Sequence, residues 1–174
     1  MNEDYESMLE DVFLEIGIRE GQEVLDFGCG SGHYTIPVAR VVGERGIVYA
    51  VDKKQNKLEK LRKKVENSDL SNIRILKTAG GTDLDFPDES IDVILLYDVF
   101  SYYGPESEEV ADLLVEANRV LNETGFLSVF PKHVDTGELK KKIRQADFDF
   151  RDRYSGTLLH DGSPEGGKLL NFIK

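Results

Sequence analysis

A glycine-rich segment at residues 26–32, with the sequence DFGCGSG, has the clearest chemical meaning in this chain. Gly28, Gly30 and Gly32 alternate with other residues, so the backbone can turn tightly and bring its N–H groups against a ligand. A helix is expected directly after the segment, and the N-terminus of a helix favours a carboxylate or a phosphate. Because any turn between a strand and a helix can use glycine structurally, the segment indicates a ligand site without identifying the ligand.

Asp52 is a second candidate, and it lies directly after the apolar run IVYAV. An acid at the end of a second strand is placed to accept two hydrogen bonds from ribose hydroxyls. The alternative is that Asp52 caps the helix predicted over the following segment, KKQNKLEKL. Nicotinamide and adenosyl cofactors both contain ribose, so Asp52 does not choose between them.

Two residues beside the glycines favour a nucleoside that carries an amino acid. A dinucleotide-binding fingerprint has glycine at the sixth position of G-x-G-x-x-G, where this chain has His33. Asp26 stands two residues before the first glycine, where a carboxylate would face the negative charge of a pyrophosphate. Beside an α-ammonium group the same carboxylate would be favourable, so a dinucleotide fits less well.

Short apolar segments alternate with amphipathic ones along the chain, and these elements must position the candidate residues. Continuous or alternating apolar residues predict strands at 24–27, 47–51, 73–76, 91–97, 126–130, 148–154 and 169–173. Apolar residues at three- and four-residue steps predict helices at 5–16, 35–42, 55–67, 106–121 and 138–146.

Repeated strand–helix alternation is typical of right-handed βαβ units and a mostly parallel sheet. The last two strands have between them only a predicted loop, Gly156 to Gly167, so they form a hairpin in which one strand is antiparallel to the rest. The expected fold is α/β, with seven strands. Such sheets bind ligands beyond the carboxyl ends of their strands, which places the site in the loops after residues 27, 51, 76 and 97.

Composition excludes several other classes of protein. The chain has 174 residues, 40% hydrophobic and 32% charged, which suits one domain: an N-terminal helix over 1–20 and a core over 21–174. One cysteine excludes a disulfide framework, and no metal site is predicted. No apolar run is long enough for a membrane span. The acidic N-terminus, MNEDYESMLED, is unlike a signal peptide, so we expect a cytoplasmic protein.

The charge of the chain limits its partners. Twenty-two Lys and Arg against 33 Asp and Glu give a net charge of −11, which disfavours broad electrostatic binding to nucleic acid. The basic segment at 53–64 has leucines at helical spacing, and we interpret it as the exposed face of an amphipathic helix.

The motifs and their order resemble the class I S-adenosylmethionine-dependent methyltransferases. VLDFGCGSG at 24–32 resembles their first motif and YAVDKK at 49–54 their second. FPDESIDVILLYDVF at 86–100 resembles the region of their fourth strand, and EANRVLNETGFLSVF at 116–130 the helix and strand that follow. The resemblance implies a Rossmann-like methyltransferase fold with strand order 3-2-1-4-5-7-6, strand 7 antiparallel and helices on both faces. It also implies S-adenosyl-L-methionine as cofactor and S-adenosyl-L-homocysteine as product.

The resemblance further implies which residues hold the cofactor. Asp26 would meet the methionine ammonium, directly or through water, and Gly28 and Gly30 would admit the methionyl part. Asp52 would hold the ribose, and the backbone near Tyr97 would contact the ammonium. The full predicted set is Asp26, Gly28, Cys29, Gly30, Gly32, His33, Asp52, Lys53, Gly81, Thr82, Asp83 and Tyr97.

Two positions depart from the pattern of the family at the adenine end. Many relatives have an acid for the adenine amino group about six residues before the Phe-Pro pair, and this chain has Gly80 there. Thr82 or Asp83 are the candidates to replace it. Relatives often have an apolar residue after the ribose-binding acid, and here it is Lys53, whose alkyl stem can cover the adenine instead.

The segment after the fourth predicted strand is where relatives place residues that bind the methyl acceptor. Asp98 is the first candidate for a general base, and Tyr102 with Tyr103 could surround the sulfonium by cation–π attraction; covering a helix is the alternative for the tyrosines. His133 follows the fifth strand and lies on the expected active edge. Cys29 is interpreted as a packing residue rather than a nucleophile.

The sequence thus predicts methyl transfer from S-adenosylmethionine to an unidentified acceptor. The acceptor is either a small molecule or a group on a protein or an RNA, and the chain is either a monomer or a homodimer. A non-catalytic S-adenosylmethionine-binding module and an NAD(P)-dependent oxidoreductase are the alternatives. We also expect the N-terminal helix, through Tyr5, Met8, Leu9 and Val12, to close the cofactor site.

Overall fold

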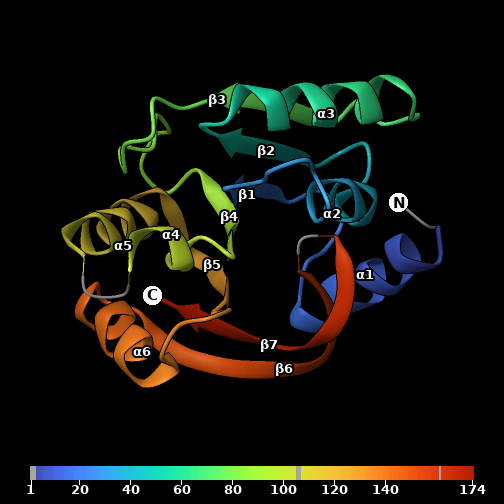
Figure 1. The fold of residues 1–174 in the computed structure, drawn as a ribbon. Coiled ribbons are helices and arrows are strands. Elements are labelled where there is room, and N and C mark those ends of the chain that lie inside the picture. The colour runs from blue at the N-terminus through green and yellow to red at the C-terminus, as the bar shows by residue number, and fades with distance from the viewer. Residues whose placement is uncertain (1–2, 105–106, 161) are drawn as a thin grey trace.

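The computed structural model describes residues 3–104, 107–160 and 162–174. Its helices and strands follow one another along the chain as Figure 1 shows: α1 (Glu3–Ile16), β1 (Glu23–Phe27), α2 (Thr35–Val42), β2 (Ile47–Asp52), α3 (Gln55–Glu66), β3 (Ile73–Lys77), β4 (Ile91–Tyr97), α4 (Phe100–Tyr103), α5 (Glu108–Val120), β5 (Leu121–Phe130), α6 (Thr136–Gln145), β6 (Asp149–His160) and β7 (Ser163–Ile173).

The seven strands form one sheet in the order β3-β2-β1-β4-β5-β7-β6. β7 is antiparallel to both of its neighbours, and the remaining pairs are parallel. This confirms the predicted order and the single antiparallel strand. The chain order reverses between β1 and β4, so the connections that leave these strands diverge and leave space at the carboxyl edge.

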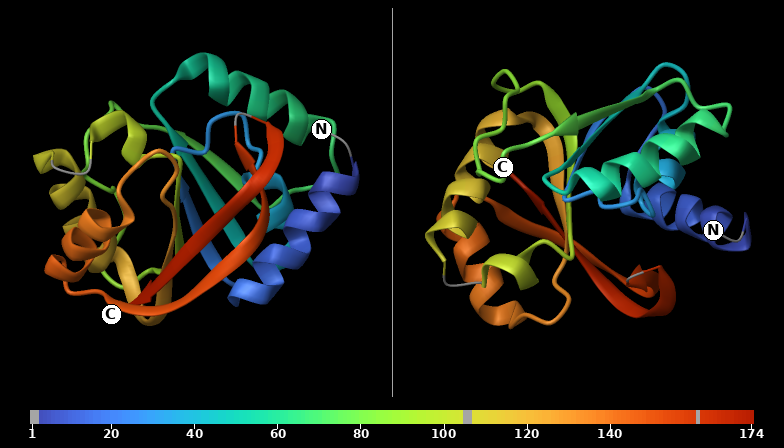
Figure 2. Two further views of the ribbon diagram at one scale, coloured as in Figure 1. Left: turned by 60° about the horizontal axis from the view of Figure 1, so that its bottom comes forward. Right: turned by 45° about the horizontal axis from the view of Figure 1, so that its top comes forward.

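An apolar core covers each face of the sheet. Val24 of β1 belongs to the core beneath α1, α2 and α3, and its neighbour Leu25 belongs to the core beneath α4, α5 and α6 (Figures 1 and 2). Both side chains are fully buried. A central parallel strand is buried on both faces, which explains why the apolar runs of β1 and β4 are nearly continuous.

The N-terminal helix α1 is part of one of these cores. Leu9 and Phe13 have no exposed surface, and the ring of Phe13 stacks against Tyr97 with 6.4 Å between the ring centroids. At the end of the helix, the guanidinium of Arg151 donates a hydrogen bond of 2.5 Å to the carbonyl oxygen of Ile16. The helix is therefore tied to the sheet by packing and by β6.

The C-terminal hairpin is longer than predicted, and the expected loop over 156–167 is wrong. β6 and β7 pair through this segment, with Gly156 opposite Gly167. A Cβ atom on Gly156 would lie 2.1 Å from the hydroxyl oxygen of Tyr154, and one on Gly167 would lie 2.6 Å from Cδ1 of Leu158. The glycines therefore allow close packing inside a strand pair and do not form a loop.

Two other boundaries differ from the prediction. β5 begins at Leu121, because this residue already pairs with Ile91 before a register shift in β4. The helix predicted from 106 begins at Glu108, where the Ser107 side chain caps it by accepting a hydrogen bond from the Val110 N–H. Residue 106 lies outside the described residues.

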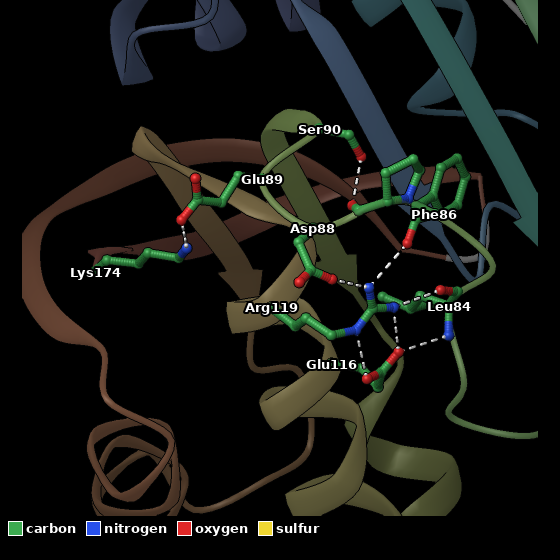
Figure 3. Close-up of polar contacts among 9 residues, drawn as sticks. Leu84, Phe86, Asp88, Glu89, Ser90, Glu116, Arg119 and Lys174 are labelled. Atoms are coloured by element: carbon green, nitrogen blue, oxygen red, sulfur yellow. Dashed lines mark hydrogen bonds and ion pairs between the residues drawn. The ribbon is translucent and has the colours of Figure 1, made fainter.

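Arg119 of α5 anchors the segment that connects β3 to β4 (Figure 3). Its guanidinium donates hydrogen bonds to the carbonyl oxygens of Leu84 and Phe86, at 2.8 and 2.9 Å, and pairs with Asp88 and Glu116. Glu116 in turn accepts a hydrogen bond of 3.1 Å from the Leu84 N–H. Arg119 also lowers the pKa of the Glu116 carboxyl. These bonds fix the second half of the connection, before β4 begins.

Candidate active site

A cavity lies at the carboxyl edge of the sheet, where β1 and β4 diverge. It has about 1050 Å³ of empty space, including the part that is open to solvent. Its lining comes from the loops after β1, β2, β3 and β4 and from the tip of the β6–β7 hairpin. The described residues that line it are Phe27, Gly28, Cys29, Gly30, Ser31, His33, Tyr34, Val51, Asp52, Lys53, Lys54, Lys57, Thr78, Gly80, Tyr97, Asp98, Val99 and Leu159.

The glycine-rich loop has a backbone that other residues would strain. Gly28 and Gly30 have φ angles of 80° and 55°, in the region that disfavours L side chains. A Cβ atom on Gly28 would also lie 2.9 Å from Cγ2 of Val99. The absence of side chains at these positions keeps the loop open toward the cavity.

Asp52 joins two parts of the cavity wall. Its Oδ2 accepts a hydrogen bond of 2.9 Å from the Gly30 N–H, and its Oδ1 accepts one of 2.7 Å from the Lys54 N–H. Helix α3 begins one residue later, at Gln55, so Asp52 stabilises the turn into the helix without bonding to a helical N–H. A carboxylate oxygen can accept more than one hydrogen bond, so the side chain can still receive hydroxyl donors from the cavity.

Asp26 is buried behind this wall. It is 2% exposed and accepts a hydrogen bond of 2.6 Å from the Thr35 hydroxyl. Burial raises the pKa of Asp26 to about 7, the Thr35 bond opposes the shift, and the charge of Asp52 adds to it. Asp26 does not line the cavity, although Phe27 and Gly28 beside it do. Contact with a ligand ammonium stays a prediction, and in this geometry it requires a bridging water or a side-chain movement.

Two buried tyrosines form the floor of the cavity. The rings of Tyr34 and Tyr97 meet edge to face with 4.8 Å between centroids, and the Tyr97 hydroxyl shares a 2.9 Å hydrogen bond with Ser128. Burial raises the pKa of both phenols, so both are neutral at physiological pH. The Tyr34 hydroxyl accepts a hydrogen bond of 3.0 Å from the Leu159 N–H and donates one to the Leu159 carbonyl oxygen, which fixes the hairpin tip over the cavity.

The opposite end of the cavity is formed by Lys53, Thr78 and Gly80. A Cβ atom on Gly80 would lie 3.4 Å from Cδ of Lys53, so the lysine stem passes close to the position where relatives have an acid. The predicted residues Gly81, Thr82 and Asp83 are not among the described residues that line the cavity. The structure thus brings Lys53, but not residues 81–83, to this end.

The predicted base Asp98 lines the cavity and joins two histidines. Its Oδ2 lies 2.9 Å from Nδ1 of His160, and Nε2 of His160 lies 3.2 Å from Nε2 of His133. Asp98 and His133 therefore belong to one cluster, although His133 itself does not line the cavity. Tyr102 lies in the short helix α4, and its side chain falls outside the described part of the structure.

Cys29 and His33 both line the cavity from the glycine-rich loop. Cys29 is 8% exposed, and burial raises the pKa of its thiol, which fits a packing role because the thiolate is the nucleophilic form. The His33 Nε2 lies 3.4 Å from the Ser31 hydroxyl. A Cβ atom on Gly162, at the hairpin tip, would lie 2.7 Å from Cε1 of His33, so the tip rests against the loop.

The expectation that α1 closes the cofactor site is not supported by this cavity. None of the described residues that line it comes from α1. Instead, Phe13 packs behind Tyr34 and Tyr97, which do line it. The helix supports the floor of the cavity from the core side.

Sequence reasoning did not include several residues of this region in the predicted set, among them Tyr34, Thr78, Leu159 and His160. Tyr34 and Thr78 lie just after predicted elements, and nothing in the sequence marks them as cavity residues. Only the fold brings them to the site. Leu159 and His160 were assigned to a loop because of the glycines around them. The available signal was the two-residue alternation from Tyr154 to Leu158, which could have extended the predicted strand to these residues. Among the described residues, no cluster of His, Cys, Asp and Glu is arranged to hold a metal ion, and no helix is long and apolar enough to cross a membrane.

Comparison with known proteins identifies the family. A family model described as a methyltransferase domain matches residues 24–125. The chain belongs to this family. The match covers the glycine-rich loop, Asp52 and Asp98, and it confirms the resemblance to the class I S-adenosylmethionine-dependent methyltransferases.

Curated relatives of this methyltransferase carry related names. The demethylmenaquinone methyltransferase of Staphylococcus aureus (strain MRSA252) is 30% identical over 142 residues, which are 80% of this chain and 55% of the relative. A probable cobalt-precorrin-6B C(15)-methyltransferase (decarboxylating) of Saccharolobus solfataricus is 29% identical over 112 residues, which are 64% of this chain and 53% of the relative. The chain thus spans about half the length of these relatives.

Solved structures show the same fold. A SAM-dependent methyltransferase from Aquifex aeolicus matches with a TM-score of 0.77 at 24% identity, and the match covers 95% of this chain and 89% of that one. The predicted Rossmann-like methyltransferase fold is confirmed by this likeness and by the strand order.

Proposed function

We propose that this protein binds S-adenosylmethionine in the cavity at the carboxyl edge and transfers its methyl group to a small-molecule acceptor. The observation that carries the proposal is the position of Asp52, whose carboxylate lines the cavity and is tied to the open glycine-rich loop through Gly30. The acid suits the hydroxyls of a ribose, and the glycine backbone at the same edge suits the methionyl part next to it.

The residues of the cavity fit this cofactor. Asp52 would accept hydrogen bonds from the ribose hydroxyls, and the backbone of Gly28 and Gly30 would lie along the methionyl part. Burial raises the pKa of Asp26 to about 7, and a nearby ammonium would favour its ionised form, which would compensate the ammonium charge. Lys53 would cover the adenine with its alkyl stem. When bound, the cofactor supplies a methyl group on a sulfonium, which is already an activated electrophile.

The remaining residues of the cavity have the roles of orienting the acceptor and removing its proton. Tyr34 and Tyr97 offer aromatic surface in a water-poor floor, and Asp98 offers a carboxylate within the same cavity. Alignment of the acceptor with the methyl group provides much of the acceleration, and a base adds to it when the acceptor loses a proton. The small-molecule assignment rests on the names of the curated relatives and on a cavity that is roofed by the hairpin tip.

Turnover to S-adenosylhomocysteine tests the proposal. Purified protein is incubated with S-adenosylmethionine and a panel of quinols, catechols, amines and tetrapyrroles, and S-adenosylhomocysteine is quantified by mass spectrometry. The proposal predicts product that depends on one class of acceptor and is lost in Asp52→Ala. Tight binding of S-adenosylmethionine without turnover on any acceptor would favour the non-catalytic binding module.

A further inference from the structure

The tip of the β6–β7 hairpin brings His160 into hydrogen-bond contact with Asp98, the candidate base. His160 is the last residue of β6, and the neighbouring Leu159 is held by both of its backbone groups on the Tyr34 hydroxyl. Gly162, on the other side of the turn, packs against His33. The hairpin is therefore fixed on both sides of His160.

His160 lies between Asp98 and a solvent-exposed histidine. Nδ1 of His160 is 2.9 Å from Oδ2 of Asp98, and its Nε2 is 3.2 Å from Nε2 of His133. The His160 and Asp98 side chains are 25% and 26% exposed, and His133 is exposed. Asp98 lines the cavity and neither histidine does. The cluster thus runs from the cavity wall toward solvent.

The backbone at both ends of this cluster has an uncommon conformation. Asp98 and His133 have φ angles of 59° and 62°, a region that non-glycine residues adopt only when their surroundings impose it. Asp98 follows β4 and His133 follows β5, and the two strands are adjacent. His160 hydrogen-bonds to both residues, and these bonds help to hold the two backbones in this conformation.

Among the described residues, charged groups face the histidines from three elements or their ends. Asp98 faces His160 from the end of β4. Glu165 of β7 pairs with Lys132, which precedes His133 by one residue. Lys132 lowers the pKa of Glu165, with smaller contributions from the two histidines. Lys132 and Glu165 thus neutralise each other, and the Asp98 carboxylate hydrogen-bonds to His160.

We propose that His160 is a positioning residue that holds the Asp98 carboxylate in place at the cavity wall, with His133 orienting the His160 ring. The proposal rests on the proposed function and deepens it. Nδ1 of His160 donates to Oδ2 of Asp98, and this bond fixes the carboxylate of a residue that lines the cavity. An acceptor with an O–H or N–H group then loses its proton to Asp98, its heteroatom forms the bond to the methyl carbon, and the electron pair of the methyl–sulfur bond returns to sulfur. The geometry therefore favours acceptors that lose a proton on methylation.

The affinities of the two cofactor forms test this role without any acceptor. An ionised Asp98 attracts the positive sulfonium of S-adenosylmethionine, whereas S-adenosylhomocysteine has a neutral sulfur. Calorimetric titration of both ligands gives a ratio of dissociation constants for each variant. In His160→Ala we expect the preference for S-adenosylmethionine to fall by about three- to tenfold, the size of a partly screened charge pair. Asp98→Asn removes the charge itself and should lower the preference by at least as much.

A conservative variant and a control separate positioning from mere structural support. His160→Asn retains an N–H group near the position of Nδ1 and should keep most of the wild-type preference. His160→Gln cannot place its amide there and should lose it, which serves if the alanine variant does not fold. The double variant Lys132→Gln/Glu165→Gln perturbs the same hairpin without a change in net charge and should leave the ratio unaltered. Thermal melts establish that each protein is folded.

The outcomes distinguish the inference from the proposed function. Equal ratios in wild type, His160→Gln and Asp98→Asn, with both ligands bound, would overturn the inference and leave the proposed function standing. A ratio that falls in Asp98→Asn but not in His160→Gln would show that Asp98 acts without His160. Failure of the wild-type protein to bind either ligand would overturn the proposed function itself, and the inference with it.

Discussion

Replacement of Asp52 by alanine tests the link between the second strand and the cofactor. Two hydrogen bonds are lost in the free protein, from the Gly30 N–H at 2.9 Å and from the Lys54 N–H at 2.7 Å. Because the cavity is open, water can reach these groups, and we expect a loss of stability of about 1–2 kcal/mol. If ribose hydroxyls also bond to the carboxylate, the loss of about 1.5–3 kcal/mol in binding weakens affinity roughly 10- to 150-fold.

Calorimetric titration of S-adenosylhomocysteine, together with thermal melts of the free proteins, separates these two effects. Asp52→Asn keeps one acceptor oxygen but turns an amide N–H toward the other backbone donor, so we expect an intermediate loss of affinity. Asp69→Ala, an exposed acid in the connection between α3 and β3, is the matched control and should bind as wild type. An Asp52→Ala protein that is folded and binds with wild-type affinity would refute the ribose assignment.

Two further substitutions test the buried acid and the first helix. The pKa of Asp26 is raised by burial from 3.8 to about 7, so the folded state holds a proton that the unfolded state loses, and stability falls as pH rises through this window. Asp26→Asn should therefore be more stable than wild type by up to about 4 kcal/mol at pH 8 but not at pH 4. The same difference in melting temperature between variant and wild type at both pH values would contradict the assignment. Phe13→Ala removes a fully buried ring and should cost about 3–5 kcal/mol in urea unfolding, whereas Leu14→Ala, 46% exposed, should change stability by less than about 0.5 kcal/mol; equal stabilities would mean that α1 is a peripheral lid.

The fold was predictable because its signals are local. Strands such as β4 are buried on both faces and therefore read as apolar runs, and each is followed by an amphipathic helix. Parallel strands bring their carboxyl ends to one edge, so the loop at residues 26–32 and Asp52 were expected to meet there. The hydrogen bond between Gly30 and Asp52 is the detail that joins them.

The length of the hairpin was mispredicted because glycine has two uses that a single sequence does not distinguish. Gly156 and Gly167 resemble turn residues, yet they pair across two strands and make room for Tyr154 and Leu158. With residues 156–167 of the hairpin assigned as a loop, His160 had no predicted position, and its contact with Asp98 across 62 residues could not be inferred.

The role of the N-terminal helix was mispredicted for a related reason. An amphipathic helix that precedes the first strand shows one apolar face, and the sequence does not tell whether that face covers a ligand or the sheet. In the structure Leu9 and Phe13 belong to the core cluster that also contains Tyr34 and Tyr97. The face therefore supports the cavity from behind.

A crystal structure of the protein with S-adenosylhomocysteine bound tests the central claim most directly. The account predicts the ligand in the cavity between the loops after β1 and β4, with both ribose hydroxyls within hydrogen-bond distance of the Asp52 carboxylate and the methionyl part along Gly28 and Gly30. Density for the ligand at another place, or a ribose that does not touch Asp52, would contradict it.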